Sequence, residues 1–173
     1  MVLIPVLFVC YYNLAINHST HHTCLSSRVP LDNSNFQVQK PYYNNVPVKQ
    51  RYSFTNGVHK FWVFSNDKPH TPSSKTEPRT EIRITGYDYT SGVWQFEGSP
   101  VLVQNIYDRW FRVNVIHNVG ASNVKVYVDG ILKYDGADHG AATHYFKFGV
   151  YTQNNPSNYM ESRWKDIKVF RRW

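Results

Sequence analysis

The chain has 173 residues, of which 42% are hydrophobic and 16% aromatic, and a formal net charge of +7. This length is sufficient for one substantial hydrophobic core and argues against a second domain. The positive charge favours acidic partners, but the basic residues are scattered and form no long run, which argues against nucleic acid as a partner.

Residues 1–30 are predicted to be a signal-like segment followed by a linker, with the folded domain over residues 31–173. Residues 1–16 form an apolar block that is too short for a membrane-spanning helix, which needs about 20 apolar residues. The block resembles the apolar part of a signal peptide; a buried strand is the alternative. We therefore expect no stable membrane span and a secretory destination, either the cell wall, the extracellular space or the vacuole.

Cysteine and histidine usage argues against a metal centre and against a disulfide framework. The only cysteines are Cys10, inside the apolar block, and Cys24, so no thiolate cluster can be assembled. The histidines near Cys24 are expected to be solvated. The sequence predicts no metal and no cofactor, and we expect a monomer.

Beyond the linker, short runs rich in β-branched and aromatic residues recur about every ten residues, with Gly, Pro, Asn, Asp and Ser between them. Asp129-Gly130 indicates a tight hairpin turn, and no stretch has a helical period. This pattern predicts an all-β jelly-roll sandwich. The runs are HKFWVFS (59–65), TEIRIT (80–85), GVWQFE (92–97), RWFRVNVIHN (109–118), NVKVYVDG (123–130), YFKFGVYT (145–152) and DIKVFRR (166–172).

Several predicted strands carry polar side chains on one face and apolar side chains on the other. Because successive residues of a strand point to opposite faces, Ile82 and Phe148 are expected in the core and their polar neighbours outside it. Charges that pair across a half-exposed sheet are the structural alternative. A mixture of cations, amides and Tyr suits a ligand with carboxylates and hydroxyls, since Arg binds a carboxylate through two parallel hydrogen bonds. The candidate ligand-binding residues are Arg79, Glu81, Arg83, Gln95, Lys147, Tyr151 and Gln153.

Two of these segments carry a family resemblance. PRTEIRI (78–84) and YFKFGVYTQ (145–153) are similar to two of the three signature strands of the alginate lyase 2 superfamily. Longer stretches, among them NGVHKFWVF (56–64) and HYFKFGVYTQNNPSNYMESRWKDIKVF (144–170), resemble its plant citrate-binding protein branch. The resemblance covers residues 32–171 and implies a lectin-like jelly roll whose concave sheet forms an open groove. In the lyase members, that groove holds a uronate polymer that is cut by β-elimination.

The resemblance also implies roles for individual residues if the chain is active. Arg79 would neutralise the substrate carboxylate, which stabilises the charge that develops when the neighbouring proton is removed. Glu81 and Arg83 would support it, Lys147 would contact the sugar, and Tyr151 would act as general base and acid.

The third signature strand, Gln-(Ile/Val)-His, is not found between the other two. Residues 94–98 (WQFEG) run directly into 99–111 (SPVLVQNIYDRWF), as if a block of roughly forty residues were missing, a loss that would expose strand edges. We therefore predict an incomplete concave sheet, with the segment 92–97 or 101–104 at an edge. His117 ends a strand that corresponds to a different strand of the family, so it is a poor substitute for the missing histidine.

These observations favour a protein that binds a carboxylate ligand, either citrate or an acidic oligosaccharide or polysaccharide, with weak or no catalysis. One alternative is a polysaccharide lyase that cleaves a uronate polymer by β-elimination. A second alternative is an inactive truncated isoform.

Overall fold

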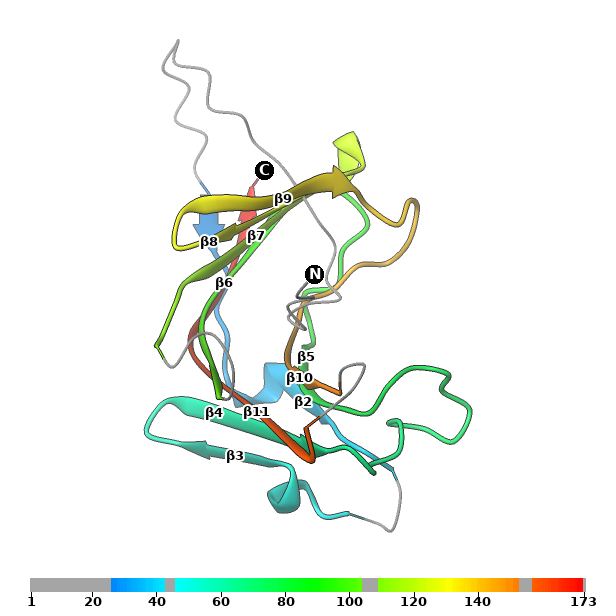
Figure 1. Cartoon of the computed structure of the whole chain (residues 1–173). Coiled ribbons are helices and arrows are strands. Elements are labelled where there is room, and N and C mark those ends of the chain that lie inside the picture. The colour runs from blue at the N-terminus through cyan, green and yellow to red at the C-terminus, as the bar shows by residue number, and fades with distance from the viewer. Residues whose placement is uncertain (1–25, 43–45, 104–108, 153–156, 173) are drawn as a thin grey trace, which may run out of the picture.

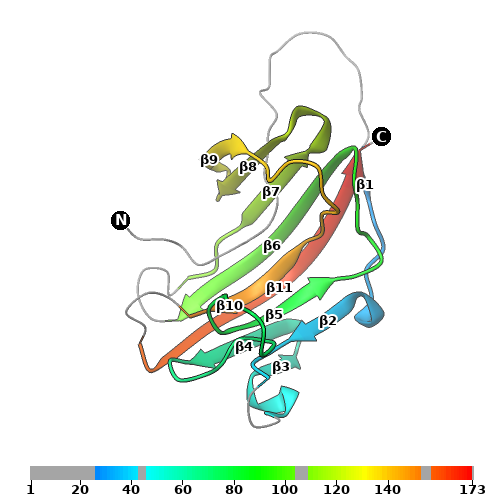
Figure 2. The same cartoon turned by 90° about the vertical axis from the view of Figure 1, so that its right-hand side faces the viewer.

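The computed structural model describes residues 26–42, 46–103, 109–152 and 157–172. This part of the chain forms two antiparallel sheets, which Figures 1 and 2 show as a large curved sheet with a smaller sheet on its inner side. The strands are β1 (Ser26–Arg28), β2 (Phe36–Gln39), β3 (Tyr52–Thr55), β4 (Val58–Phe64), β5 (Arg79–Ile84), β6 (Val93–Val103), β7 (Val113–Asn118), β8 (Asn123–Val128), β9 (Ile131–Ala137), β10 (Lys147–Tyr151) and β11 (Tyr159–Arg172). The 3-10 helices are η1 (Asn33–Asn35), η3 (Val48–Gln50) and η4 (Val119–Ala121).

The large sheet has eight strands in the order β3-β4-β11-β6-β7-β8-β9, with β1 also paired to β11. The small sheet has three strands in the order β10-β5-β2. The predicted all-β sandwich is confirmed, and so is the hairpin turn between β8 and β9. Asp129 and Gly130 have φ angles of 50° and 80°, as the mirror-image turns that match strand twist require.

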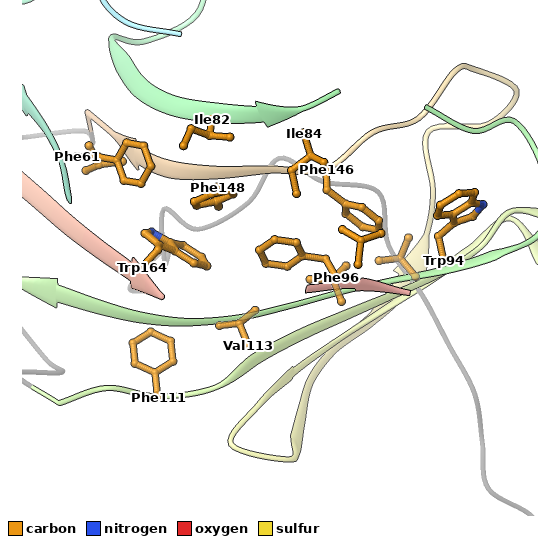
Figure 3. Close-up of a cluster of buried hydrophobic side chains, with 14 of the residues drawn as sticks. Phe61, Ile82, Ile84, Trp94, Phe96, Phe111, Val113, Phe146, Phe148 and Trp164 are labelled. Atoms are coloured by element: carbon orange, nitrogen blue, oxygen red, sulfur yellow. The ribbon is translucent and has the colours of Figure 1, made fainter. Parts of the chain in front are cut away.

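The hydrophobic core lies between the two sheets (Figure 3). Ile82 and Phe148 point inward from the small sheet, and Phe96 and Trp164 point toward them from the large sheet. The Phe148 ring lies 5.6 Å from that of Trp164 and 6.0 Å from that of Phe96, measured between centroids. The apolar half of each alternating pattern therefore enters the core as predicted.

The structure shows where residues 92–104, next to the predicted missing block, lie in the sheets. Residues 93–103 form one continuous strand of the large sheet, and residues 93–97 pair with β11 on one side and with β7 on the other. Of the two predicted edge positions, 92–97 is therefore wrong. Residues 99–103 pair with β11 alone among the described strands, so the alternative at 101–104 fits the part of it that the structure describes. The sheet with few strands is the small one, which carries both signature segments.

The described residues begin within the stretch predicted to be a linker. There, β1 pairs with the end of β11, and the Val29 backbone N–H donates to the Val169 carbonyl at 2.9 Å. The apolar block at residues 1–16, with the predicted signal function, lies outside the described residues. Among the described residues, no helix has the length and apolar character needed to cross a membrane.

Candidate functional site: a polar face on the small sheet

Polar side chains from all three strands of the small sheet gather on the face that points away from the core. Strand register brings them together, because Glu81 on β5 lies between Gln39 on β2 and Gly149 on β10. On the same pair of strands, Arg79 lies opposite Tyr151. We call this surface the polar face; its residues are Gln39, Arg79, Glu81, Arg83, Lys147 and Tyr151.

Glu81 is the centre of the hydrogen-bond network on the polar face. Its side chain is only 1% exposed, and its carboxylate accepts hydrogen bonds from Lys147 Nζ at 2.9 Å and from the Tyr151 hydroxyl. Lys147 Nζ also donates to Gln39 Oε1 at 2.7 Å, and Arg79 Nη1 lies 3.6 Å from Glu81 Oε1. A buried carboxylate needs such partners, because an unpaired charge away from water is strongly destabilising.

Gly149 makes room for this arrangement. A Cβ atom at residue 149 would overlap the Thr80 carbonyl oxygen and the Cα of Glu81, and it would lie 2.6 Å from the Glu81 Cβ. The absence of a side chain at residue 149 therefore lets β5, with its buried carboxylate, approach β10 closely.

Arg79 and Tyr151 form a tightly coupled pair at one end of the polar face. Arg79 Nη1 donates to the Tyr151 hydroxyl at 2.8 Å, and the guanidinium carbon lies 4.4 Å from the centre of the Tyr151 ring. Burial raises the pKa of Tyr151, and the Glu81 carboxylate raises it further. Tyr151 is therefore held as a neutral phenol that donates to Glu81. Arg79 Nε is buried and has no hydrogen-bond partner among the described residues.

Arg83 lies on the polar face but has a carboxylate partner of its own. Its guanidinium forms a salt bridge with Asp88, and the guanidinium carbon lies 4.2 Å from the centre of the Tyr145 ring. Lys147 Nζ lies 5.5 Å from the centre of the same ring. Since Asp88 balances Arg83, the excess positive charge on the polar face comes from Arg79 and Lys147, which together face the single carboxylate of Glu81.

The loop between β4 and β5 carries a histidine, His70, whose pKa responds to the charges of the polar face. Burial lowers the pKa of His70, and the positive charges of Arg79 and Lys147 lower it further. His70 is therefore a neutral imidazole near neutral pH, and the charges of the two cations contribute to this state. Its Nδ1 atom is buried and has no hydrogen-bond partner in the described part of the chain.

The structure brings together five of the seven predicted ligand-binding residues: Arg79, Glu81, Arg83, Lys147 and Tyr151. It does not bring Gln95 to them. Gln95 lies on β6 of the large sheet, and its side chain donates to Asn114 Oδ1 at 2.5 Å on the face opposite to the core. Gln153 lies outside the described residues.

His117 does not belong to the polar face either. It is fully buried on β7 and shares hydrogen bonds with Tyr89 and Asp138. Its weakness as a substitute for the missing family histidine follows from this position, because the core lies between β7 and the polar face.

Three residues of this site were missed by reasoning from the sequence. Gln39 could have been found, because Phe36 and Val38 alternate with Gln37 and Gln39 in a short strand pattern. His70 and Asp88 lie in connections without a periodic pattern, so nothing local indicates where their side chains point.

Comparisons with known proteins identify the family of this chain. The alginate lyase family matches residues 29–109 and 101–171. The citrate-binding protein of Hevea brasiliensis is 39% identical, over 96% of this chain and 90% of the relative. That match extends over 216 residues, whereas this chain has 173, so at least 43 positions of the match have no counterpart here. The two ranges matched by the family overlap at residues 101–109. This overlap lies next to the position where the sequence predicts a missing block.

Solved structures show a likeness at the level of the fold. A sialidase gives a TM-score of 0.50 at 12% identity, over 79% of this chain and 17% of the sialidase. A prokaryotic β-1,3-1,4-glucanase (lichenase) from a mouse hindgut metagenome gives a TM-score of 0.43 at 9% identity, over 85% of this chain and 97% of the glucanase.

The fold and the site define an antiparallel β-sandwich with a polar, cation-rich face on its smaller sheet. The chain belongs to the alginate lyase 2 superfamily, in the citrate-binding protein branch.

Proposed function

We propose that this chain binds a carboxylate ligand, citrate or an acidic oligosaccharide, at the polar face, with little or no turnover. The observation that carries the proposal is the orphaned donor of Arg79, whose buried Nε has no partner among the described residues. A buried donor without an acceptor is unfavourable, and a ligand carboxylate would supply the acceptor. The relative named for citrate binding supports the same ligand class.

Local charge supports the proposal. Arg79 and Lys147 outnumber Glu81, so the polar face attracts an anion even though part of its positive charge is already balanced. This attraction should weaken as salt increases, because the Debye length falls to about 8 Å at physiological ionic strength and shortens further above it.

Weak catalysis follows from the state of Tyr151. A tyrosine that removes a proton must first lose its own, but burial and the Glu81 carboxylate, which accepts a hydrogen bond from the Tyr151 hydroxyl, raise the pKa of the phenol. General acid–base catalysis typically contributes about 10²- to 10⁴-fold. We therefore expect elimination to be slower by about that range than in a relative with a complete site.

Calorimetric titration with citrate tests the binding proposal. We expect Arg79→Gln to weaken citrate binding about tenfold or more, because a hydrogen bond to a charged group contributes about 1.5–3 kcal/mol. Arg109→Gln is the matched control, since the Arg109 side chain is 61% exposed and pairs with Asp129 near β8. Equal affinity of wild type and Arg79→Gln for citrate and for oligouronates would contradict the proposal.

A second candidate function, a uronate lyase, is favoured by one observation: burial and the charges of Arg79 and Lys147 lower the pKa of His70, which keeps its imidazole neutral. Such a group could remove a proton in place of the missing family histidine. Incubation with polymannuronate, polyguluronate and glucuronan, followed by ultraviolet absorbance of unsaturated uronates, distinguishes the two functions. Turnover that is lost in Tyr151→Phe and reduced in His70→Gln would establish the lyase.

A further inference from the structure

A second cluster of ionisable side chains lies on the core side of the large sheet, apart from the polar face. It consists of His117 on β7, Asp138 just after β9, and His144 before β10. The loop that follows β9 carries two of the three residues, and an isolated bridge between Tyr89 and His144 holds its far end. The cluster has no role in the proposed binding of carboxylates.

The three side chains are buried and close together. His117 is 0% exposed and His144 3%, and the Asp138 side chain is 2% exposed. One nitrogen of each imidazole and one carboxylate oxygen all lie within 4.8 Å of one another. His117 Nε2 lies 3.0 Å from Asp138 Oδ2.

Neighbouring groups orient these donors toward a common point. Tyr89 hydroxyl lies 3.0 Å from His117 Nδ1, so the other ring nitrogen of His117 faces Asp138. The Gly140 N–H donates to Asp138 Oδ1 at 2.7 Å and leaves Oδ2 on the inner side. Metal-bound histidines typically use their second ring nitrogen in such an outer hydrogen bond, which also fixes the ring.

We propose that His117, Asp138 and His144 bind a divalent transition-metal ion, with Zn²⁺ as the best match. Two imidazoles and one carboxylate suit Zn²⁺ rather than Ca²⁺ or Mg²⁺, which prefer sites made of oxygen atoms. Bond lengths of about 2.0–2.2 Å to Zn²⁺ place adjacent tetrahedral ligands about 3.3 Å apart. The distance between His117 Nε2 and Asp138 Oδ2, 3.0 Å, is already close to that spacing. A small movement of the loop that carries His144 would bring its imidazole nitrogen to a similar distance from the other two ligand atoms.

Binding would exchange the His117–Asp138 hydrogen bond for two metal–ligand bonds. Neutral His117 would change tautomer, with its proton moved from Nε2 to Nδ1, so that Nε2 becomes a ligand and Nδ1 donates a hydrogen bond to the Tyr89 hydroxyl. Three protein ligands leave a fourth position open, as in zinc sites that hold a water molecule or a substrate.

Titration of the full, EDTA-treated chain with Co²⁺ and Zn²⁺ tests the proposal. We expect one Co²⁺ ion to give the visible absorption bands of a four-coordinate site, Zn²⁺ to displace it, and Zn²⁺ but not Mg²⁺ to raise the melting temperature. His144→Gln should lose the bands and the shift, whereas His139→Gln, which changes an exposed neighbour, should keep both.

Asp138→Asn provides a second test in case His144→Gln fails to fold, because the amide oxygen retains the hydrogen bond from Gly140. Circular dichroism reports the fold of each variant. Absence of Co²⁺ and Zn²⁺ binding by the wild type would overturn the proposal. So would unchanged binding in a folded His144→Gln or Asp138→Asn variant, which would place the ion elsewhere, for example at the histidines near the N-terminus.

Discussion

The two faces of the small sheet differ in how far their side chains are buried and in what that burial does. Phe148 and Ile82 on the inner face contribute area to the core, and burial of one such side chain stabilises the fold by about 1.5–3 kcal/mol. On the outer face, the half-buried Lys147 forms an ion pair with the buried Glu81, and an apolar pair of similar size could replace it with little loss of stability. The inner face therefore accounts for the fold, whereas the outer face carries the proposed ligand site.

The largest loss of stability is expected on the inner face. Phe148→Ala should reduce the free energy of unfolding by about 3–5 kcal/mol, because it leaves a cavity among aromatic side chains of both sheets. Chemical denaturation followed by tryptophan fluorescence measures the loss. Phe54→Ala is the control, since Phe54 is 48% exposed, and it should cost much less. Equal losses in both variants would refute this account of the core.

Glu81→Gln should produce the largest effect on the outer face. It leaves Arg79 and Lys147 without a balancing carboxylate, and breaking a buried pair in this way costs about 3 kcal/mol or more. Asp88→Asn is the matched control, because the more exposed pair of Arg83 with Asp88 should contribute only about 0–1 kcal/mol. If both variants unfold at the wild-type denaturant concentration, Glu81 does not organise the polar face.

Gly149→Ala should have a smaller effect at the same place. The added methyl group overlaps the β5 backbone, and such overpacking typically costs about 1–3 kcal/mol. Gly120→Ala is the control, since the nearest atom to its Cβ would be Asn118 Oδ1 at 3.7 Å. Thermal melting of the two variants measures the difference. A Gly149→Ala protein as stable as Gly120→Ala would show that β5 and β10 can separate freely.

The smallest change in stability at neutral pH is expected for a substitution of His59, a histidine that packs against the core residue Phe148. Burial lowers the pKa of His59 from 6.5 to about 4, and its ring lies 5.3 Å from that of Phe148. The unfolded chain therefore takes up the proton first as pH falls, so stability is complete above about pH 6.5 and decreases toward pH 4.

His59→Phe should reduce this loss of stability with acid, as measured by the unfolding free energy at several pH values. It should not abolish the loss, because burial also lowers the pKa of His117 and of His144. The same substitution at the exposed His139 should change the acid loss of stability much less than His59→Phe does. A His59→Phe profile identical to that of the wild type would contradict the expected titration.

Much of the strand architecture could be predicted from the sequence. The alternation in 80–85 and 145–152 identified β5 and β10, and Asp129-Gly130 identified the hairpin between β8 and β9. The predicted runs were too short for β6 and β11, which extend to Val103 and begin at Tyr159. Their extra residues include Pro100, Arg163 and Lys165, which weaken the local strand signal but are accommodated by pairing along both strands.

The sequence by itself determined which side chains share a face of a strand, and it also determined the family and the absence of Gln-x-His. Only the tertiary structure decided which strands lie side by side. It placed Gln95 in the other sheet and paired Arg83 with Asp88. The physical reason is range: alternation is a property of consecutive residues, whereas strand pairing and loop position depend on contacts between segments far apart in the chain.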